Sequence, residues 1–246
     1  MPSGRATSGS HPRPRPIAGK PLRITVLTGA GISAESGLAT FRAVDGLWES
    51  HRIEDVATPE GFAADPALVH RFYNMRRKDA AGAQPNAAHL ALADLARRHD
   101  LTLVTQNVDD LHERAGSPEV IHMHGSLSGA LCAACGHRWP APPVMSPDDS
   151  CPACARPATR PDIVWFGEMP YHMERIWDAL ESADLFAAIG TSGNVYPAAG
   201  FAQHARRQGV ECLELNLEGS ANARDFHRRI TGPAGRTVPE WVASLG

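Results

Sequence analysis

The amino-acid sequence predicts an α/β fold: a Rossmann-like, doubly wound parallel sheet with a smaller domain of different character inserted into it. Three observations support this prediction. Short apolar runs alternate with helical patterns, the first run ends in a glycine-rich turn, and a segment rich in Cys and Pro interrupts the alternation. A length of 246 residues fits one large domain that carries small inserts.

Four apolar runs are expected to form strands of the sheet. Each has the length of a buried strand and several end in polar residues. They cover residues 22–28, 101–107, 185–192 and 212–217. Because open α/β sheets bind ligands beyond the carboxyl ends of their strands, the polar ends of these runs predict where the site lies.

Helical patterns lie between the first two of these runs. Residues 66–80 form one predicted helix, and Asn86 is expected to cap a second one, whose apolar face includes Leu92 and Leu95. We expect residues 21–246 to form one domain with a helical insert of about 43–85 and a Cys-rich insert of about 128–162.

Composition limits the classes of partner. With 24 basic and 27 acidic residues the formal charge is −3, so nucleic-acid binding is not expected. No apolar run reaches the length of a membrane span. Residues 1–20 are rich in Pro, Ser, Gly and Arg and lack the apolar stretch of a signal peptide, so we expect a disordered tail and a cytoplasmic location. The alternative for this basic tail is contact with acidic partners.

The first run ends in Gly29-Ala30-Gly31-Ile32-Ser33-Ala34, which matches G-x-G-x-x-G/A. Such a turn allows close backbone approach to a pyrophosphate at the N-terminus of the next helix, although a purely structural glycine turn is the alternative. No clear second strand ends in an acidic residue about 20 positions on, unlike in a dehydrogenase. A loop with Thr40, Phe41, Arg42 and Trp48 follows instead, as a site-covering segment does.

Four cysteines predict a metal site. Cys132 and Cys135, and then Cys151 and Cys154, form two C-x-x-C pairs separated by 15 residues, the spacing of a zinc ribbon. Four thiolates leave no open position, so the Zn²⁺ would be structural. The alternatives are a redox or disulfide role, or nucleic-acid binding by the ribbon, which the few basic residues of this segment disfavour. Cys212 lies in an apolar run and is expected to be a core thiol.

Several further segments, together with these features, form an ordered set of motifs. They are Gly29–Gly37 with Thr40-Phe41-Arg42, Gln106-Asn107-Val108-Asp109, His124-Gly125, Gly190-Thr191-Ser192, Asn216-Leu217-Glu218 and Gly232-Pro233-Ala234. In this order the sequence resembles the sirtuin family over about residues 22–244. One departure is Ala39, where many members have proline; it should change loop stiffness more than chemistry.

The resemblance implies a sirtuin fold, in which the site lies in a cleft between a Rossmann-like domain and a smaller zinc-ribbon and helical domain. It also implies an NAD-dependent protein-lysine deacylase. NAD would be a consumed co-substrate: the acyl oxygen attacks the ribose carbon as nicotinamide leaves, and the products are lysine, nicotinamide and O-acyl-ADP-ribose. The expected partners are acyl-lysine protein substrates, with one structural Zn²⁺.

The resemblance also implies the roles of individual residues. His124 would be the general base, and Asn107 and Asp109, two apart and therefore on one face of an extended chain, would act with it. His122 should point to the opposite face. The implied cofactor contacts are Gly29, Ala30, Gly31, Ser33, Ala34, Glu35, Thr40, Phe41, Arg42, Trp48, Gln106, Asn107, Asp109, Gly190, Thr191, Ser192, Asn216, Leu217, Glu218 and Ala234.

Tyr73 and Arg76 share a helix face and could jointly hold a carboxylate, although a plain surface pair is the alternative. They resemble the Tyr-x-x-Arg signature of class III sirtuins, and Ala57 resembles the small residue that widens the acyl pocket there. Residues 160–168 match the same class, and their extended part could pair with a substrate backbone. The implied substrate contacts are Ala57, Tyr73, Arg76, Val164, Trp165, Phe166, Gly167 and Glu168. We therefore expect deacetylase together with desuccinylase or demalonylase activity.

Three other functions use the same features. A mono-ADP-ribosyltransferase would share the NAD loop but would need no acyl pocket. A non-catalytic NAD or zinc-ribbon interaction protein would have lost Asn107, Asp109 or His124, and all three are present. A conventional NAD oxidoreductase would need a hydride-transfer constellation, which we do not recognise in this sequence.

Overall fold

A six-stranded sheet organises the molecule. The computed structural model describes residues 20–40, 47–48 and 51–246. Strand order in the sheet is β11-β10-β9-β1-β4-β5, and every neighbouring pair is parallel. The strands are β1 (Arg23–Thr28), β4 (Asp100–Thr105), β5 (Ile121–His122), β9 (Leu185–Ile189), β10 (Glu211–Asn216) and β11 (Arg228–Thr231).

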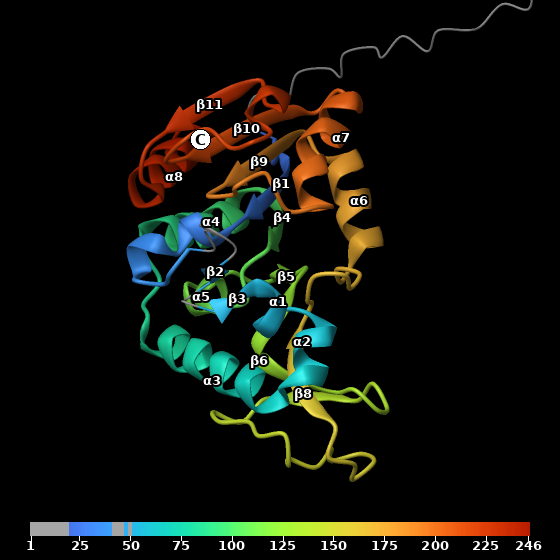
Figure 1. Ribbon diagram of the computed structural model, residues 1–246. Coiled ribbons are helices and arrows are strands. Elements are labelled where there is room, and N and C mark those ends of the chain that lie inside the picture. The colour runs from blue at the N-terminus through green and yellow to red at the C-terminus, as the bar shows by residue number, and fades with distance from the viewer. Residues whose placement is uncertain (1–19, 41–46, 49–50) are drawn as a thin grey trace, which may run out of the picture.

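Helices cover both faces of this sheet, as a doubly wound fold requires (Figure 1). The helices α4 (Ala87–Arg98) and α8 (Ala234–Ala243) cover one face, where Leu92 and Trp241 belong to one apolar cluster with Val26 of β1. The helices α6 (Met173–Ser182) and α7 (Phe201–Arg207) cover the other face. The predicted α/β class is therefore confirmed, and so is the Asn86 cap, because its side chain accepts a hydrogen bond from the amide of Ala88.

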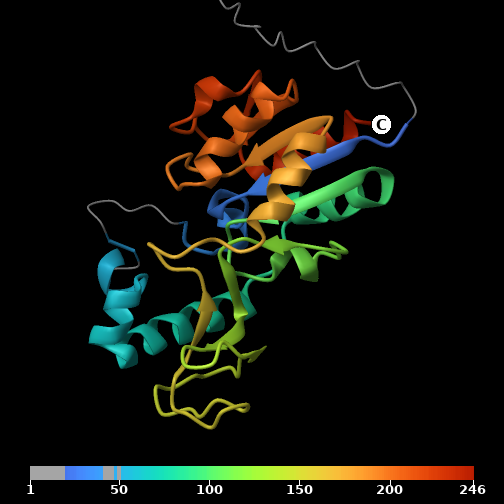
Figure 2. The ribbon, with the colours of Figure 1, turned by 90° about the vertical axis from the view of Figure 1, so that its right-hand side faces the viewer.

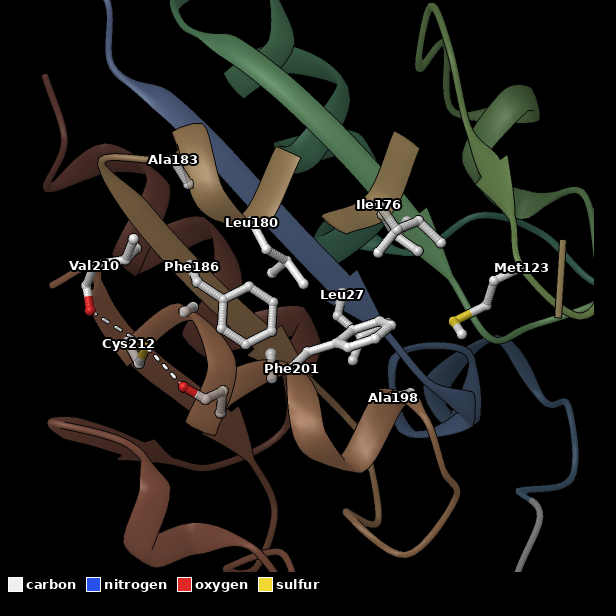
Figure 3. Close-up of a cluster of buried hydrophobic side chains, with 14 of the residues drawn as sticks. Leu27, Met123, Ile176, Leu180, Ala183, Phe186, Ala198, Phe201, Val210 and Cys212 are labelled. Atoms are coloured by element: carbon white, nitrogen blue, oxygen red, sulfur yellow. Dashed lines mark hydrogen bonds between the residues drawn. The ribbon is translucent and has the colours of Figure 1, made fainter. Parts of the chain in front are cut away.

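The fifth cysteine, Cys212, lies in the core beneath α6 and α7. Figure 3 shows Leu180 and Phe201 meeting Phe186 above the sheet, with Cys212 beside them. The Cys212 thiol is fully buried and lies 3.5 Å from the carbonyl oxygens of Ala202 and Val210. Burial raises the pKa of this thiol to about 12, so it is a core residue, as expected.

A smaller second layer lies below the carboxyl ends of the parallel strands (Figure 2). A three-stranded antiparallel sheet, in the order β7-β6-β8, lies there with three helices, of which α3 contacts β6 and β8. Side chains from both parts, including Phe72, Leu127 and Ile163, share one apolar cluster. Its elements are α1 (Ile53–Val56), α2 (Pro59–Ala64), α3 (Pro66–Gly82), β6 (Gly125–Cys132), β7 (Arg138–Pro140) and β8 (Thr159–Ile163).

The predicted insert of about 43–85 contributes Phe72 and Tyr73 to this core, whereas Leu127, Ile163 and Trp165 lie just outside the predicted insert of about 128–162. The boundaries of both inserts stay predictions. The remaining elements are short: β2 (Leu47–Trp48), β3 (His51–Arg52), α5 (Leu111–Arg114), and the 3₁₀ helices Ala30–Ile32, Ala34–Ser36, Ala198–Gly200 and Ala223–Asp225. The predicted tail, 1–20, lies outside the described residues except for Lys20. Among the described helices, none has the length and apolar character of a membrane span.

One local prediction was wrong. We expected a helix directly after the glycine turn, but residues 30–36 form two single turns of 3₁₀ helix that end at Gly37 in a left-handed conformation. The first α-helix on this face of the sheet is α4, more than 50 residues later. The backbone amides that follow the glycine turn therefore belong to two tight turns. They do not lie at the N-terminus of a long helix, where a helix dipole would act.

Candidate active site

The site begins at the point in the sheet where the chain changes the side on which it adds strands. From β1 the chain continues to β4 and β5 on one side, and it then returns to β9 on the other side of β1. Such a switch point leaves a crevice at the carboxyl ends of the two adjacent strands. Gly29 follows β1 there and Gly190 follows β9, and the amide of Gly31 donates a 2.9 Å hydrogen bond to the carbonyl of Gly190.

The glycines allow these two loops to touch. A Cβ on Gly31 would lie 2.7 Å from the Cα of Gly190, and one on Gly190, where φ is +63°, would lie 2.5 Å from the amide of Ile32. Both substitutions would push the loops apart. The glycine turn thus has the structural role that is the alternative to a purely cofactor-binding one. Because it lets the two loops touch, it also shapes the crevice.

A cavity of about 390 Å³ fills the space between the switch point and the smaller layer. This volume lies within the range of roughly 300–1,000 Å³ that is usual for ligand pockets. Polar groups from the strand ends line one part of it and apolar side chains from the smaller layer line another. The predicted cofactor contacts that line it are Gly29, Ala30, Gly31, Thr40, Gln106, Gly190, Thr191, Ser192, Asn216 and Glu218. The donors and acceptors of this group fit a dinucleotide with its pyrophosphate and ribose hydroxyls.

His124 lines the same cavity, in the short connection between β5 and β6. Its Nδ1 lies 3.1 Å from the carbonyl oxygen of Gln106. Since a carbonyl can only accept, Nδ1 carries the proton and the lone pair belongs to Nε2. Burial lowers the pKa of His124, so the ring is neutral at pH 7 and Nε2 can accept a proton.

His122 has different partners. Its Nε2 lies 2.7 Å from Glu113 Oε1 and its Nδ1 lies 3.1 Å from the carbonyl of Asn107. Burial alone would lower its pKa, but the hydrogen bond and charge of Glu113 outweigh this effect and raise it. His122 does not line the cavity, in agreement with the expectation that the two rings point to opposite sides.

A second cavity, of about 100 Å³, adjoins the first, and Ala30 and Val108 line both. Ser33, Asn107 and Asp109 meet there. The Asn107 amide donates to Ser33 Oγ (3.1 Å), and the Ser33 hydroxyl donates to Asp109 Oδ2 (3.3 Å). The predicted pairing of Asn107 with Asp109 is thus observed, with Ser33 as the link between them. Burial raises the pKa of Asp109.

The predicted acyl contacts form the apolar end of the large cavity. Ala57, Tyr73 and the segment Val164–Glu168 all line it. Tyr73 and Arg76 are both buried on α3, so the alternative of a plain surface pair is wrong. Arg76 lines the second cavity and Tyr73 the first, so the two side chains face adjoining spaces. The strand β8 is an edge strand whose extended part ends at Ile163.

Some predicted contacts lie elsewhere. Ala34, Glu35, Leu217 and Ala234 line neither of the two cavities. The carboxylate of Glu35 instead accepts a 2.6 Å hydrogen bond from the amide of Gly235 at the start of α8. Phe41 and Arg42 lie outside the described residues, and of Trp48 only the backbone, in β2, is described.

Sequence reasoning also missed lining residues. They are Val108, Ile163, Pro170, Val195, Tyr196, Gly219 and Ser220. Most are apolar or small and carry no chemical signature. Ser220 lies in the loop after β10, which is held against the loop after β9. The amide of the next residue, Ala221, donates a hydrogen bond to the carbonyl of Ser192.

The four predicted metal ligands converge at the far end of β6. The Sγ atoms of Cys132 and Cys154 lie 3.7 Å apart, those of Cys135 and Cys151 lie 3.8 Å apart, and all four lie within 4.8 Å of one another. A tetrahedral Zn²⁺ with Zn–S bonds of about 2.3 Å needs sulfur atoms about 3.8 Å apart. Disulfide bonds need about 2.05 Å, so this geometry fits a zinc ion and not two disulfides.

Both cysteine pairs use the same turn. The amide of Gly136 donates to the carbonyl of Cys132, and the amide of Ala155 donates to the carbonyl of Cys151, each at 2.9 Å. The pairs are therefore held in position by backbone hydrogen bonds. All four ligands come from the protein, so the site has no open position for substrate and is structural.

Known proteins share this arrangement. The family model described as the Sir2 family matches residues 29–197. The chain belongs to the Sir2 family. A relative named NAD-dependent protein deacylase, from Caulobacter vibrioides, is 56% identical over 230 residues, which cover 91% of this chain and 97% of the relative.

Two solved Sir2 structures are also similar. A mutant Sir2 homologue in complex with ADP-ribose superposes with a TM-score of 0.85 at 40% identity, covering 90% of this chain and 91% of that one. A Sir2 homologue in complex with NAD gives a TM-score of 0.83 at 40% identity, covering 90% and 88%. The sirtuin fold expected from the motifs is thus confirmed for this Sir2 family member.

Proposed function

We propose that this Sir2 family protein is an NAD-dependent protein-lysine deacylase that releases nicotinamide and O-acyl-ADP-ribose. The position of His124 carries the proposal. Its imidazole lines one cavity that joins the glycine loops of the switch point to an apolar pocket of the smaller layer. A neutral base between a dinucleotide site and an acyl site is what this reaction needs. The relatives named NAD-dependent protein deacylase and the NAD-bound Sir2 homologue support it.

The chemistry that NAD supplies is a ribose carbon from which nicotinamide departs and to which the acyl oxygen bonds. We assign to His124 the removal of a proton from a ribose hydroxyl. The Gln106 carbonyl holds its tautomer, and burial keeps it neutral. A base that must reach a hydroxyl needs a free lone pair, and Nε2 provides one.

We assign the second cavity to the nicotinamide and its ribose. Ser33 connects the amide of Asn107 to the carboxylate of Asp109, so the three polar groups have fixed orientations before any ligand binds. Such preorganisation lowers the cost of ordering the site in the reaction. The four-cysteine zinc site would hold together the chain after β6 and the chain before β8, and it takes no part in the chemistry.

For the acyl group we propose acetyl together with carboxylated acyl groups such as succinyl and malonyl. Ala57, with its small side chain, lines the large cavity together with Tyr73. One turn further along α3, Arg76 lines the adjoining cavity. A hydroxyl and a buried positive charge can together hold a carboxylate that a neutral acetyl group does not offer.

A mass-spectrometric assay tests the reaction. One peptide is prepared in acetyl-lysine and succinyl-lysine forms and incubated with zinc-loaded protein, with and without NAD. We expect NAD-dependent loss of both acyl groups with formation of O-acyl-ADP-ribose. ADP-ribose attached to the peptide or to another protein would favour a mono-ADP-ribosyltransferase instead. No NAD-dependent change in either peptide would favour a non-catalytic NAD-binding protein.

The acyl preference has its own test. Arg76→Met should weaken use of the succinyl peptide and spare use of the acetyl peptide. Arg71→Met, at an exposed position on the same helix, is the matched control. Equal losses on both peptides in Arg76→Met would show that Arg76 only supports the fold.

A further inference from the structure

Tyr73 has a hydrogen-bond partner that sequence reasoning did not foresee. The indole Nε1–H of Trp165 donates a 3.0 Å hydrogen bond to the Tyr73 hydroxyl oxygen. Tyr73 is 1% exposed and Trp165 2%, so water does not compete for this contact. An indole N–H can only donate, and therefore the hydroxyl can only accept from Trp165.

The Trp165 ring is itself held firmly. The guanidinium carbon of Arg160 lies 3.5 Å from the centre of the ring, in a cation–π contact. Arg160 is fixed in turn by two hydrogen bonds to Glu168, at 2.7 and 2.9 Å. Glu168 also accepts the backbone amide of Trp165 at 2.8 Å. The indole therefore has little freedom to turn away from Tyr73.

This geometry decides where the Tyr73 hydroxyl proton points. A phenolic O–H lies in the plane of its ring and has two in-plane directions. Trp165 occupies one of them with its own hydrogen. Among the residues that the structure describes, no group accepts the Tyr73 O–H, and Tyr73 and Ala57 both line the large cavity. The proton is therefore directed at whatever fills the acyl end.

We propose that Trp165 is a positioning residue for acyl selectivity. By donating to the Tyr73 oxygen, it presents the Tyr73 hydroxyl as a hydrogen-bond donor toward the distal carboxylate of an acidic acyl group. The inference rests on the proposed deacylase function. A hydroxyl donor favours an anionic acceptor, whereas an acetyl methyl group gains nothing from it.

Trp165→Phe isolates this role, because it removes the N–H but keeps an aromatic ring for Arg160 and for Phe62, whose ring centre lies 5.2 Å away. We expect KM for a succinyl peptide to rise about three- to tenfold, the effect of one hydrogen bond. The kcat for that peptide should change less than its KM, and kcat/KM should fall more for the succinyl peptide than for the acetyl peptide. Thermal unfolding of the zinc-loaded variant, compared with the wild type, shows that it folds.

A double-mutant cycle completes the test. Tyr73→Phe should lower the succinyl-to-acetyl ratio of kcat/KM, and adding Trp165→Phe to it should lower the ratio no further, since the hydroxyl to be oriented is gone. Trp177→Phe, on α6 against Phe201, is the matched control and should leave the ratio unchanged.

Three outcomes would overturn the inference. One is an unchanged ratio in Trp165→Phe, and another is independent, multiplicative losses in the double variant. The third is a wild-type protein that deacetylates but does not desuccinylate, which leaves the deacylase proposal standing. If the wild type uses neither peptide, the proposed function fails first and the inference fails with it.

Discussion

Two histidines, only two positions apart, differ in proton affinity because their partners differ. Glu113 raises the pKa of His122 against the effect of burial, whereas burial lowers the pKa of His124, whose partner is a neutral carbonyl. As the pH falls, His122 therefore takes up a proton before His124 does. The residue that faces the cavity is the one that stays a base.

The first prediction concerns the pH profile. Because the pKa of His124 is lowered, the acid limb of kcat/KM should lie below the usual histidine value of about 6.5. His124→Gln should lower kcat about 100-fold or more, the usual contribution of a general base. Steady-state rates between pH 5 and 8 check both. Glu113→Gln is the control, and an acid limb that moves with this variant would assign the titration to His122.

The second prediction separates a cap from a cofactor contact. The Glu35 carboxylate binds the amide of Gly235, at the N-terminus of α8, where a negative charge is favourable. Glu35→Ala should lower the free energy of unfolding by about 1 kcal/mol, as for the loss of a helix cap. Urea titration measures this change, with Glu60→Ala, in the first turn of α2, as control. A raised KM for NAD at unchanged stability would instead restore the cofactor role.

At the scale of elements, α3 connects the acyl pocket with the zinc module. Tyr73 faces the large cavity, while the next residue, Asn74, binds the backbone of Met145 in the loop before Cys151. Its amide donates to the Met145 carbonyl at 2.8 Å, and its oxygen accepts the Met145 amide at 2.9 Å. One helix thus places the acyl contact and anchors the cysteine-rich segment.

The third prediction follows from this anchor. Asn74→Ala leaves the Met145 amide and carbonyl without their partners, which should cost about 1–3 kcal/mol of unfolding free energy. Lys78→Ala, at an exposed position of the same helix, should cost much less. Thermal unfolding of zinc-loaded protein compares the two variants. Equal stability in both would mean that the Cys132–Cys154 module holds its position without α3.

Local sequence patterns predicted those elements whose stability is local. The run that became β1 is buried from Ile24 to Thr28, and α4 has its own cap and apolar face. The turns after Gly29 depend instead on contact with Gly190, more than 150 residues later, so no local pattern could predict that the expected helix would be absent there. The same is true of Glu35, whose partner is Gly235.

At the scale of the whole molecule, the site combines two layers that the sequence interleaves. The motifs named His124 and the strand-end polar residues, which line the cavity, because each of these groups carries its own signature. They could not locate Tyr196 or Ser220, which line the cavity only because loops from distant parts of the chain meet there. Nor could they predict the hydrogen bond from the Trp165 indole to the Tyr73 hydroxyl, which depends on how α3 packs against the segment after β8.

Buried histidines in both layers make the stability of the whole protein depend on pH. Burial lowers the pKa of His89 to about 4 and that of His112 well below its usual value, and it also lowers the pKa of His70. Below about pH 6.5 the unfolded chain therefore binds more protons than the folded one, which destabilises the fold. His122 opposes this trend, because its pKa is raised and its contribution is lost as the pH rises.

The fourth prediction is that the free energy of unfolding is largest above about pH 6.5 and falls as the pH decreases toward 4, with about 2 kcal/mol lost through His89 alone by pH 5. His89→Gln tests this assignment, because Gln at the third helical position can still accept the amide of Asn86 but does not titrate. Urea unfolding at pH 7.5 and 5.0 should show a smaller difference for His89→Gln than for the wild type. His137→Gln, at an exposed position, should keep the wild-type difference. If His89→Gln keeps it as well, the other buried histidines and the acidic groups must carry the pH dependence.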